Sequence, residues 1–195
     1  MDVRVCFVGD SFVAGVGDPG HLGWTGRVAV RTPFPLTRYV LGVRRETSAQ
    51  VARRWRAECG PRLPAGSRNA VVLSFGVNDT TLEDGRPRVR PQESVATLDG
   101  VLREVPWPVL VVGPPAVDDE AQNERSAVLD AGFARVCAAA GVAYVPVLEH
   151  LRADAVWRRE VRDGDGAHPA AAGYERLARL VEPAWRGFVH RLADG

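Results

Sequence analysis

The first strand-like stretch of the chain is Val3-Arg4-Val5-Cys6-Phe7-Val8, and it runs directly into the polar turn Gly9-Asp10-Ser11-Phe12. A short apolar run rich in β-branched residues and ended by Gly is typical of a buried strand. The run is apolar nearly throughout, which favours a strand covered on both faces, as in a parallel sheet. This stretch therefore predicts both the type of sheet and a polar turn at its edge.

The remaining chain repeats this alternation of short apolar runs and longer helical patterns. Strand and helix in turn predict an α/β protein with a five-stranded parallel sheet between two helix layers, a three-layer α/β/α fold. At 195 residues and 46% hydrophobic composition, we expect a single domain over residues 1–195. The other expected strands are Tyr39–Val43, Ala70–Phe75, Val109–Val112 and Val142–Val147, and the expected helices are Gly23–Arg31, Ser48–Glu58, Pro91–Val105, Asn123–Ala140 and Ala170 to about Leu192.

Two local signals refine this outline. Ser48 stands where a helix cap is expected, and Gly60-Pro61 stops the same helix. The polar segment 79–90 follows the third expected strand and predicts a surface loop beside the site.

Charge and composition exclude several classes of partner. The 25 basic residues, all Arg, nearly balance 24 acidic ones, and a net charge of +1 offers no footprint for nucleic acid or an anionic membrane surface. No stretch approaches the length of a membrane span, and the apolar run Val3–Val8 is too short for a signal-peptide core, so we expect a cytoplasmic protein. The spacing of Cys6, Cys59 and Cys137 predicts buried, reduced thiols. Nothing in the sequence indicates an oligomeric state.

Polar residues gather where the expected strands end, which is where open α/β sheets bind ligands. Ser11 follows the first strand, Asn78 follows the third, and His168 lies in a Gly-rich loop before the last helix. Asp165 precedes His168 by three residues and can reach its Nδ1 atom, with Asp163 as the fallback.

These residue types match the needs of acyl transfer. That chemistry needs a hydroxyl nucleophile, a base, a carboxylate that orients the base, and donors for an oxyanion. Ser11, His168, Asp165 and Asn78 supply these roles in that order, so neither a metal nor a cofactor is required. The expected partner is a small-molecule ester substrate.

The sequence resembles the SGNH (GDSL-like) hydrolase family in three blocks. These are Gly9-Asp10-Ser11, Gly76-Val77-Asn78-Asp79 and Asp165-Gly166-Ala167-His168. The segment Tyr39–Ser48 resembles the remaining block of that family. The resemblance implies a flavodoxin-like fold and hydrolysis of esters or thioesters through an acyl-enzyme.

The resemblance also implies an oxyanion hole made of the Ser11 amide, the Asn78 side chain and a backbone amide from the segment Tyr39–Ser48. The family often has Gly where this chain has Arg45, and a Cβ makes a positive φ costly there. Arg45 and Gly42 are therefore both candidates for that amide.

Several alternatives stay open at this level. The same residues suit an acyltransferase or a carbohydrate deacetylase, and a non-catalytic binding domain would share the fold. A cofactor-binding flavodoxin-like protein is disfavoured, because the turn after the first strand lacks both Gly-rich phosphate-binding patterns. Binding of an anionic group by Arg44, Arg45, Arg86 and Arg88 is also open.

Overall fold

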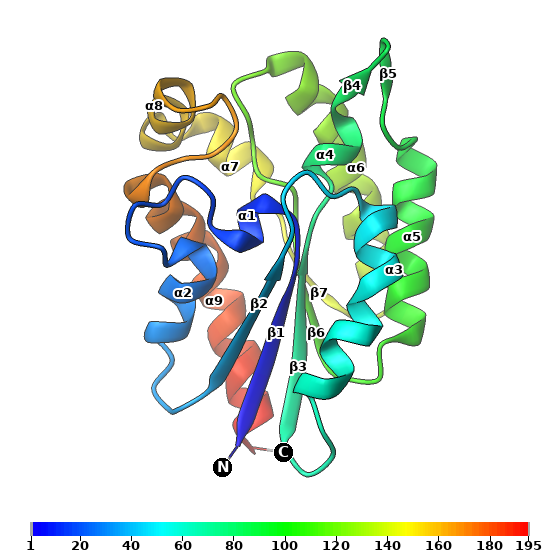
Figure 1. Ribbon diagram of the computed structural model, residues 1–195, viewed down its shortest axis with the longest axis vertical. Coiled ribbons are helices and arrows are strands. Elements are labelled where there is room, and N and C mark those ends of the chain that lie inside the picture. Colours follow the sequence, from blue (N-terminus) through cyan, green and yellow to red (C-terminus); the bar gives the residue numbers. More distant parts are fainter. Residues whose placement is uncertain (1, 195) are drawn as a thin grey trace.

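The computed structural model describes residues 2–194, which form an α/β structure around a five-stranded sheet (Figure 1). The strand order is β2-β1-β3-β6-β7 and all neighbouring pairs are parallel, which confirms the predicted fold class. The strands are β1 (Val3–Gly9), β2 (Thr37–Gly42), β3 (Arg68–Ser74), β6 (Val109–Val112) and β7 (Ala143–Val145).

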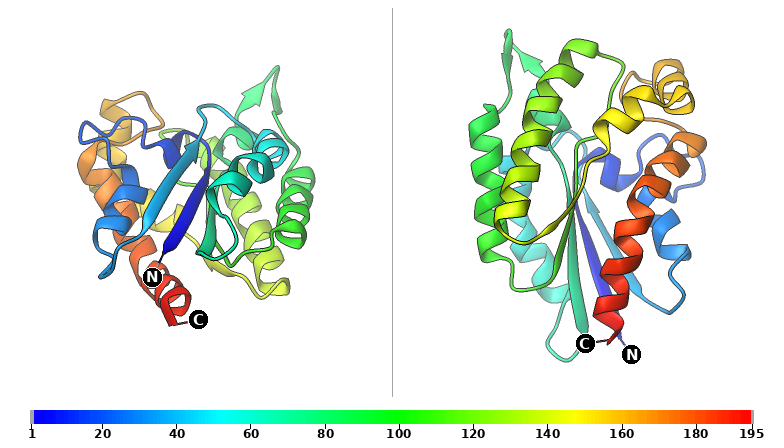
Figure 2. Two further views of the ribbon diagram at one scale, coloured as in Figure 1. Left: turned by 60° about the horizontal axis from the view of Figure 1, so that its bottom comes forward. Right: turned by 180° about the vertical axis from the view of Figure 1, so that it is seen from behind.

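Helices cover both faces of this sheet, as Figures 1 and 2 show. One layer holds α2, α7, α8 and α9, and the other holds α3, α5 and α6. Their bounds are α2 (Gly23–Val30), α3 (Ser48–Cys59), α5 (Pro91–Glu104), α6 (Glu120–Ala139), α7 (Leu148–Ala153), α8 (Ala155–Asp163) and α9 (Ala171–Asp194), and a short 3-10 turn (Gly60–Arg62) follows α3.

Alternation along β1 explains why the sheet has a core on each side. Val3, Val5 and Phe7 pack into the core beneath α2 and α9, whereas Cys6 and Val8 pack into the core beneath α3 and α5. Successive side chains of a strand point to opposite faces, so a strand that is apolar throughout requires two covered faces. The three cysteines are buried in the second core and unbridged, as the sequence predicts.

Some predicted boundaries are wrong. Residues 148–163, for which no element is predicted, form α7 and α8, and the strand predicted over Val142–Val147 is only the three residues of β7. Asp154 begins α8 as a cap, since its carboxylate accepts from the amides of Val156 and Trp157 at 2.9 Å each. β7 is short because it is an edge strand that pairs only with the short β6.

The caps and loops around the second and third blocks also differ from the predictions. Thr47, not Ser48, is the cap of α3, because the Gln50 side chain accepts from the Thr47 amide at 2.8 Å. The expected surface loop 79–90 begins inside the helical turn α4 (Val77–Thr80) and continues as a hairpin of β4 (Leu82–Glu83) and β5 (Arg86–Pro87). Asp79 is buried instead of lying on the surface.

The carboxyl ends of the strands lie at the top of Figure 1, together with α1 (Ser11–Ala14), α4, the hairpin and α8. Parallel pairing brings these ends together from distant parts of the sequence, because every strand points the same way. None of the helices within residues 2–194 combines the length and apolar composition that a membrane span requires.

Candidate active site

Ser11 lies on a sharp turn at the end of β1. The Asp10 carboxylate accepts from the Phe12 amide at 3.0 Å and so caps α1, of which Ser11 is the first residue. Ser11 is 5% exposed. The turn therefore presents one hydroxyl from an otherwise buried backbone.

His168 reaches Ser11 from the far end of the chain. Its Nε2 atom is 2.8 Å from Ser11 Oγ, and its Nδ1 atom is 2.7 Å from Asp165 Oδ2. The other carboxylate oxygen of Asp165 accepts from the amides of Ala167 at 3.0 Å and His168 at 2.8 Å. Three polar side chains thus form one hydrogen-bonded chain, although Ser11 and His168 are 157 residues apart.

Asp165 is held in its ionised form. Partial burial alone would raise its pKa, but hydrogen bonds from the His168 amide, the His168 ring and the Ala167 amide lower the pKa to about 2. Asp163, the fallback, ends α8 and is exposed to solvent. The geometry therefore brings Asp165, and not Asp163, to the histidine.

Two aromatic side chains, Phe12 and Trp157, pack beside the histidine ring. The Phe12 ring lies 4.9 Å from the His168 ring and stacks on Trp157 at 6.3 Å with an interplanar angle of 19°. Trp157 is itself fixed, because its Nε1 donates to the Ala116 carbonyl at 3.0 Å. The sequence did not indicate this supporting role for Phe12 and Trp157, since their contact joins segments far apart in the chain.

Asn78 lies beside Ser11, on the turn α4 that follows β3. Its Nδ2 donates to the Glu46 carbonyl at 3.0 Å and lies 3.5 Å from Asp10 Oδ2. The neighbouring Asp79 accepts from the Ser48 amide at 2.7 Å and so ties the second block to the third. Burial raises the pKa of Asp10 to about 7, and the nearby charge of Asp79 adds to that rise.

The two candidate amide donors of the second block have different environments. Arg45 has a φ of 65°, the left-handed conformation that favours glycine, and among residues 2–194 nothing accepts a hydrogen bond from its amide. The Val43 amide donates to the Gly9 carbonyl, so Val43 faces β1. In a parallel pair only every second residue bonds to the neighbouring strand, so the Gly42 amide points away from β1, to the free edge of the sheet. Gly42 instead lets β2 pack closely against the backbone of Asp10. A Cβ added at Gly42 would lie only 2.6 Å from the Asp10 carbonyl oxygen. This geometry favours Arg45 over Gly42 as the donor.

A cavity of about 240 Å³ opens at Ser11. The predicted residues Ser11, Asn78, Asp165 and His168 all line it. It also holds Val117, Asp119 and Gln122, which the sequence analysis missed. Their place in the sequence could have indicated them. They follow the turn Gly113-Pro114-Pro115 at the carboxyl end of β6, and ligands bind at the carboxyl ends of strands in such sheets.

Comparison with known proteins identifies a family. Residues 7–176 match the GDSL-like Lipase/Acylhydrolase family. The chain belongs to this family. Its members cleave esters, so the protein is an ester-cleaving hydrolase.

Individual relatives of this GDSL-like hydrolase are distant. A GDSL lipase from Mycobacterium tuberculosis is 29% identical over 202 residues, which cover 92% of this chain and 80% of that protein. A lipase/acylhydrolase from Enterococcus faecalis has a TM-score of 0.79 at 19% identity, with 95% of this chain and 96% of that chain covered. An acetylxylan esterase from Geobacillus stearothermophilus has a TM-score of 0.75 at 18% identity, with 94% of each chain covered. The two solved structures show that the fold is shared.

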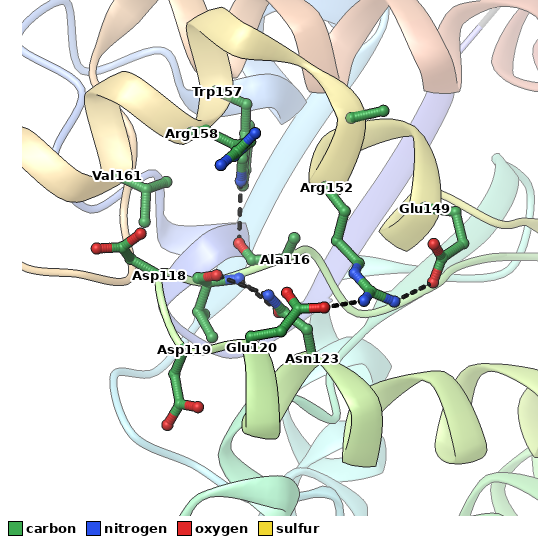
Figure 3. A pocket seen from close by; sticks show the side chains of 12 residues that line it. Ala116, Asp118, Asp119, Glu120, Asn123, Glu149, Arg152, Trp157, Arg158 and Val161 are labelled. Carbon is green, nitrogen blue, oxygen red and sulfur yellow. Dashed lines mark hydrogen bonds and ion pairs between the residues drawn. The ribbon is translucent and has the colours of Figure 1, made fainter.

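A larger groove of about 590 Å³, drawn in Figure 3, adjoins the Ser11 cavity of the hydrolase. Val117 and Asp119 line both. Figure 3 shows Arg152 between Glu120 and Glu149, and both carboxylates pair with it. Asn123 fixes the wall of the groove by two hydrogen bonds to the Val117 backbone, at 2.9 and 2.8 Å. The groove is thus a charged and mainly polar surface next to the Ser11 cavity.

Proposed function

We propose that this GDSL-like hydrolase cleaves small carboxylic esters through an acyl-enzyme on Ser11. The hydrogen-bonded chain from Ser11 Oγ through His168 to Asp165, with contacts of 2.8 and 2.7 Å, carries the proposal. A serine is a weak nucleophile unless an adjacent base takes its proton, and this arrangement offers that base.

In the first half of the reaction, Ser11 Oγ attacks the ester carbonyl while His168 Nε2 accepts the hydroxyl proton. Asp165 accepts the Nδ1 proton of His168 in a hydrogen bond, which leaves Nε2 free as the base and stabilises the imidazolium that forms. The tetrahedral oxyanion receives hydrogen bonds from the amides of Ser11 and Arg45 and from the Asn78 side chain. His168 then protonates the departing alcohol, and the C–O bond to that alcohol breaks.

In the second half, water replaces the alcohol. His168 takes a proton from the water, which attacks the acyl carbonyl, and the same donors stabilise the second oxyanion. His168 returns this proton to Ser11 Oγ as the acid leaves. The net reaction adds one water to one ester.

The dimensions and lining of the site suggest a substrate class. The cavity of about 240 Å³ is below the range of roughly 300–1,000 Å³ that holds drug-sized ligands, which favours a short acyl chain. The polar groove beside it suits a polar alcohol, and one structural relative is named an acetylxylan esterase. Deacetylation of a carbohydrate ester is therefore the second candidate function.

Labelling with a fluorophosphonate probe tests the mechanism directly. We expect the parent protein to be modified on Ser11 and to hydrolyse p-nitrophenyl acetate, and we expect Ser11→Ala to lose both properties. Ser67→Ala is the matched control, because Ser67 lies on the loop before β3, at the opposite end of the sheet. Full esterase activity in a folded Ser11→Ala protein would overturn the proposal.

A series of esters separates the two substrate candidates. p-Nitrophenyl esters of increasing chain length, measured beside acetylated sugars, report the acyl preference and the alcohol preference independently. We expect kcat/KM to be highest for acetyl and other short esters. A preference for long acyl chains would contradict the assignment of a short-chain substrate while leaving the Ser11 mechanism intact.

A further inference from the structure

Arg45 has a strained backbone at a position that the proposed mechanism uses. Its φ of 65° crowds the Cβ against the following carbonyl, which disfavours this conformation for every residue except glycine. Such a conformation persists only where the surroundings hold it. The contacts that hold Arg45 are therefore part of the site.

Arg88 makes the contact that fixes the Arg45 carbonyl. Its guanidinium donates to the Arg45 carbonyl oxygen at 2.8 Å, and its Nε lies 3.0 Å from a carboxylate oxygen of Glu83 on β4. The Arg88 side chain itself is 16% exposed, whereas its partners Arg45 and Glu83 are exposed to solvent. A hydrogen bond from a charged donor is among the stronger ones in a protein.

The backbone that carries Arg88 is tied to the turn that carries Asn78. The Arg88 amide donates to the Thr81 carbonyl at 3.0 Å, and the Val89 amide donates to the Asp79 carbonyl at 3.1 Å. Asn78 itself holds the next carbonyl of the second block, that of Glu46. Two connected segments, α4 and the β4–β5 hairpin, thus donate hydrogen bonds to two successive carbonyls, those of Arg45 and Glu46.

We propose that Arg88 is a positioning residue that keeps Arg45 left-handed, so that the Arg45 amide faces the oxyanion. This inference rests on the proposed acyl-enzyme mechanism. It assigns the β4–β5 hairpin a share in transition-state stabilisation. Arg88 touches no reacting atom, and its effect passes through the Arg45 peptide.

The test is Arg88→Met made in two backgrounds, the parent and Arg45→Gly. In the parent, loss of the charged hydrogen bond lets Arg45 leave the left-handed region, and we expect kcat for p-nitrophenyl acetate to fall roughly tenfold. KM and the pH profile are expected to stay the same, since neither the binding cavity nor His168 changes. In the Arg45→Gly background, glycine reaches the left-handed region freely, so we expect a fall of less than about threefold.

Two further variants serve as controls. Arg86→Met removes the exposed arginine of β5, which has no side-chain contact to Arg45 among the described residues, and it is expected to keep parental kcat. Arg88→Lys keeps the positive charge and can still donate a hydrogen bond, so we expect it to retain more activity than Arg88→Met. If Arg88→Met does not fold, Arg88→Lys replaces it as the test variant.

The outcomes separate this inference from the proposed function. If the parent is labelled on Ser11 but Arg88→Met lowers kcat equally in both backgrounds, or changes only KM, the positioning role is overturned and the mechanism stands. An unlabelled parent overturns both.

Discussion

Replacing Asp165 by asparagine tests how the carboxylate controls His168. One oxygen of Asp165 accepts from the amides of Ala167 and His168 at 3.0 and 2.8 Å, while the other is 2.7 Å from the ring Nδ1. An asparagine at this position keeps the hydrogen bonds from the Ala167 and His168 amides only if its side-chain oxygen accepts them. Its NH2 group then faces Nδ1 of His168. That NH2 then donates to Nδ1, so the ring proton moves to Nε2 and the base for Ser11 is lost.

The size of the effect follows from these contacts. The opposite orientation of the asparagine sets its NH2 against two amide donors and loses two hydrogen bonds, each worth about 0.5–1.5 kcal/mol, so the wrong tautomer dominates. In serine triads this inversion lowers kcat about 10⁴-fold. We expect a loss of that size, which raises the barrier by about 5 kcal/mol at about 1.4 kcal/mol per tenfold.

The assay is kcat for p-nitrophenyl acetate at neutral pH, with thermal unfolding as the check on folding. Asp163→Asn is the matched control: it has the same chemical change two residues away at the exposed end of α8, and we expect parental kcat. The reasoning is refuted if folded Asp165→Asn keeps more than about a tenth of the parental kcat, or if Asp163→Asn loses as much.

Two further predictions concern stability. The pKa of Asp10 is raised to about 7 from an unfolded value of about 3.9, so the folded state holds an extra proton between these values. The free energy of unfolding, measured in urea, should therefore fall by up to about 1.4 kcal/mol per pH unit from about pH 4 to pH 7 relative to Asp10→Asn, and a difference independent of pH would contradict the assignment. Gly42→Ala should lower stability by about 1–3 kcal/mol or more, because its Cβ would meet the backbone of Asp10 and Ala14. Gly60→Ala has open space and a φ of −49°, so its melting temperature should not fall, and an equal loss in both variants would refute the packing argument.

Local patterns predicted most of the architecture. Each of the five strands of the sheet agrees with its apolar run to within two residues at either end, because a strand covered on both faces is apolar over most of its length. Helices α7 and α8 were not predicted, although Asp154 is a residue type that commonly caps the start of a helix and does so for α8. Their segment is short and rich in charge. Trp157 lies in the core, where it contacts Phe12 and Ala116.

The sequence by itself determined the type of sheet and predicted candidate roles for Ser11, Asn78, Asp165 and His168, since residue type and placement in the loops that follow strands or precede helices are local properties. Only the tertiary structure brings Asp165, and not Asp163, to His168, and only its geometry favours Arg45 over Gly42 as the candidate donor. The first choice depends on how the loop before α9 folds around His168, and the second depends on hydrogen bonds between distant segments, Arg88 to the Arg45 carbonyl and Val43 to Gly9. A backbone dihedral or a side-chain direction that is held from across the fold leaves no trace in the neighbouring residues of the chain.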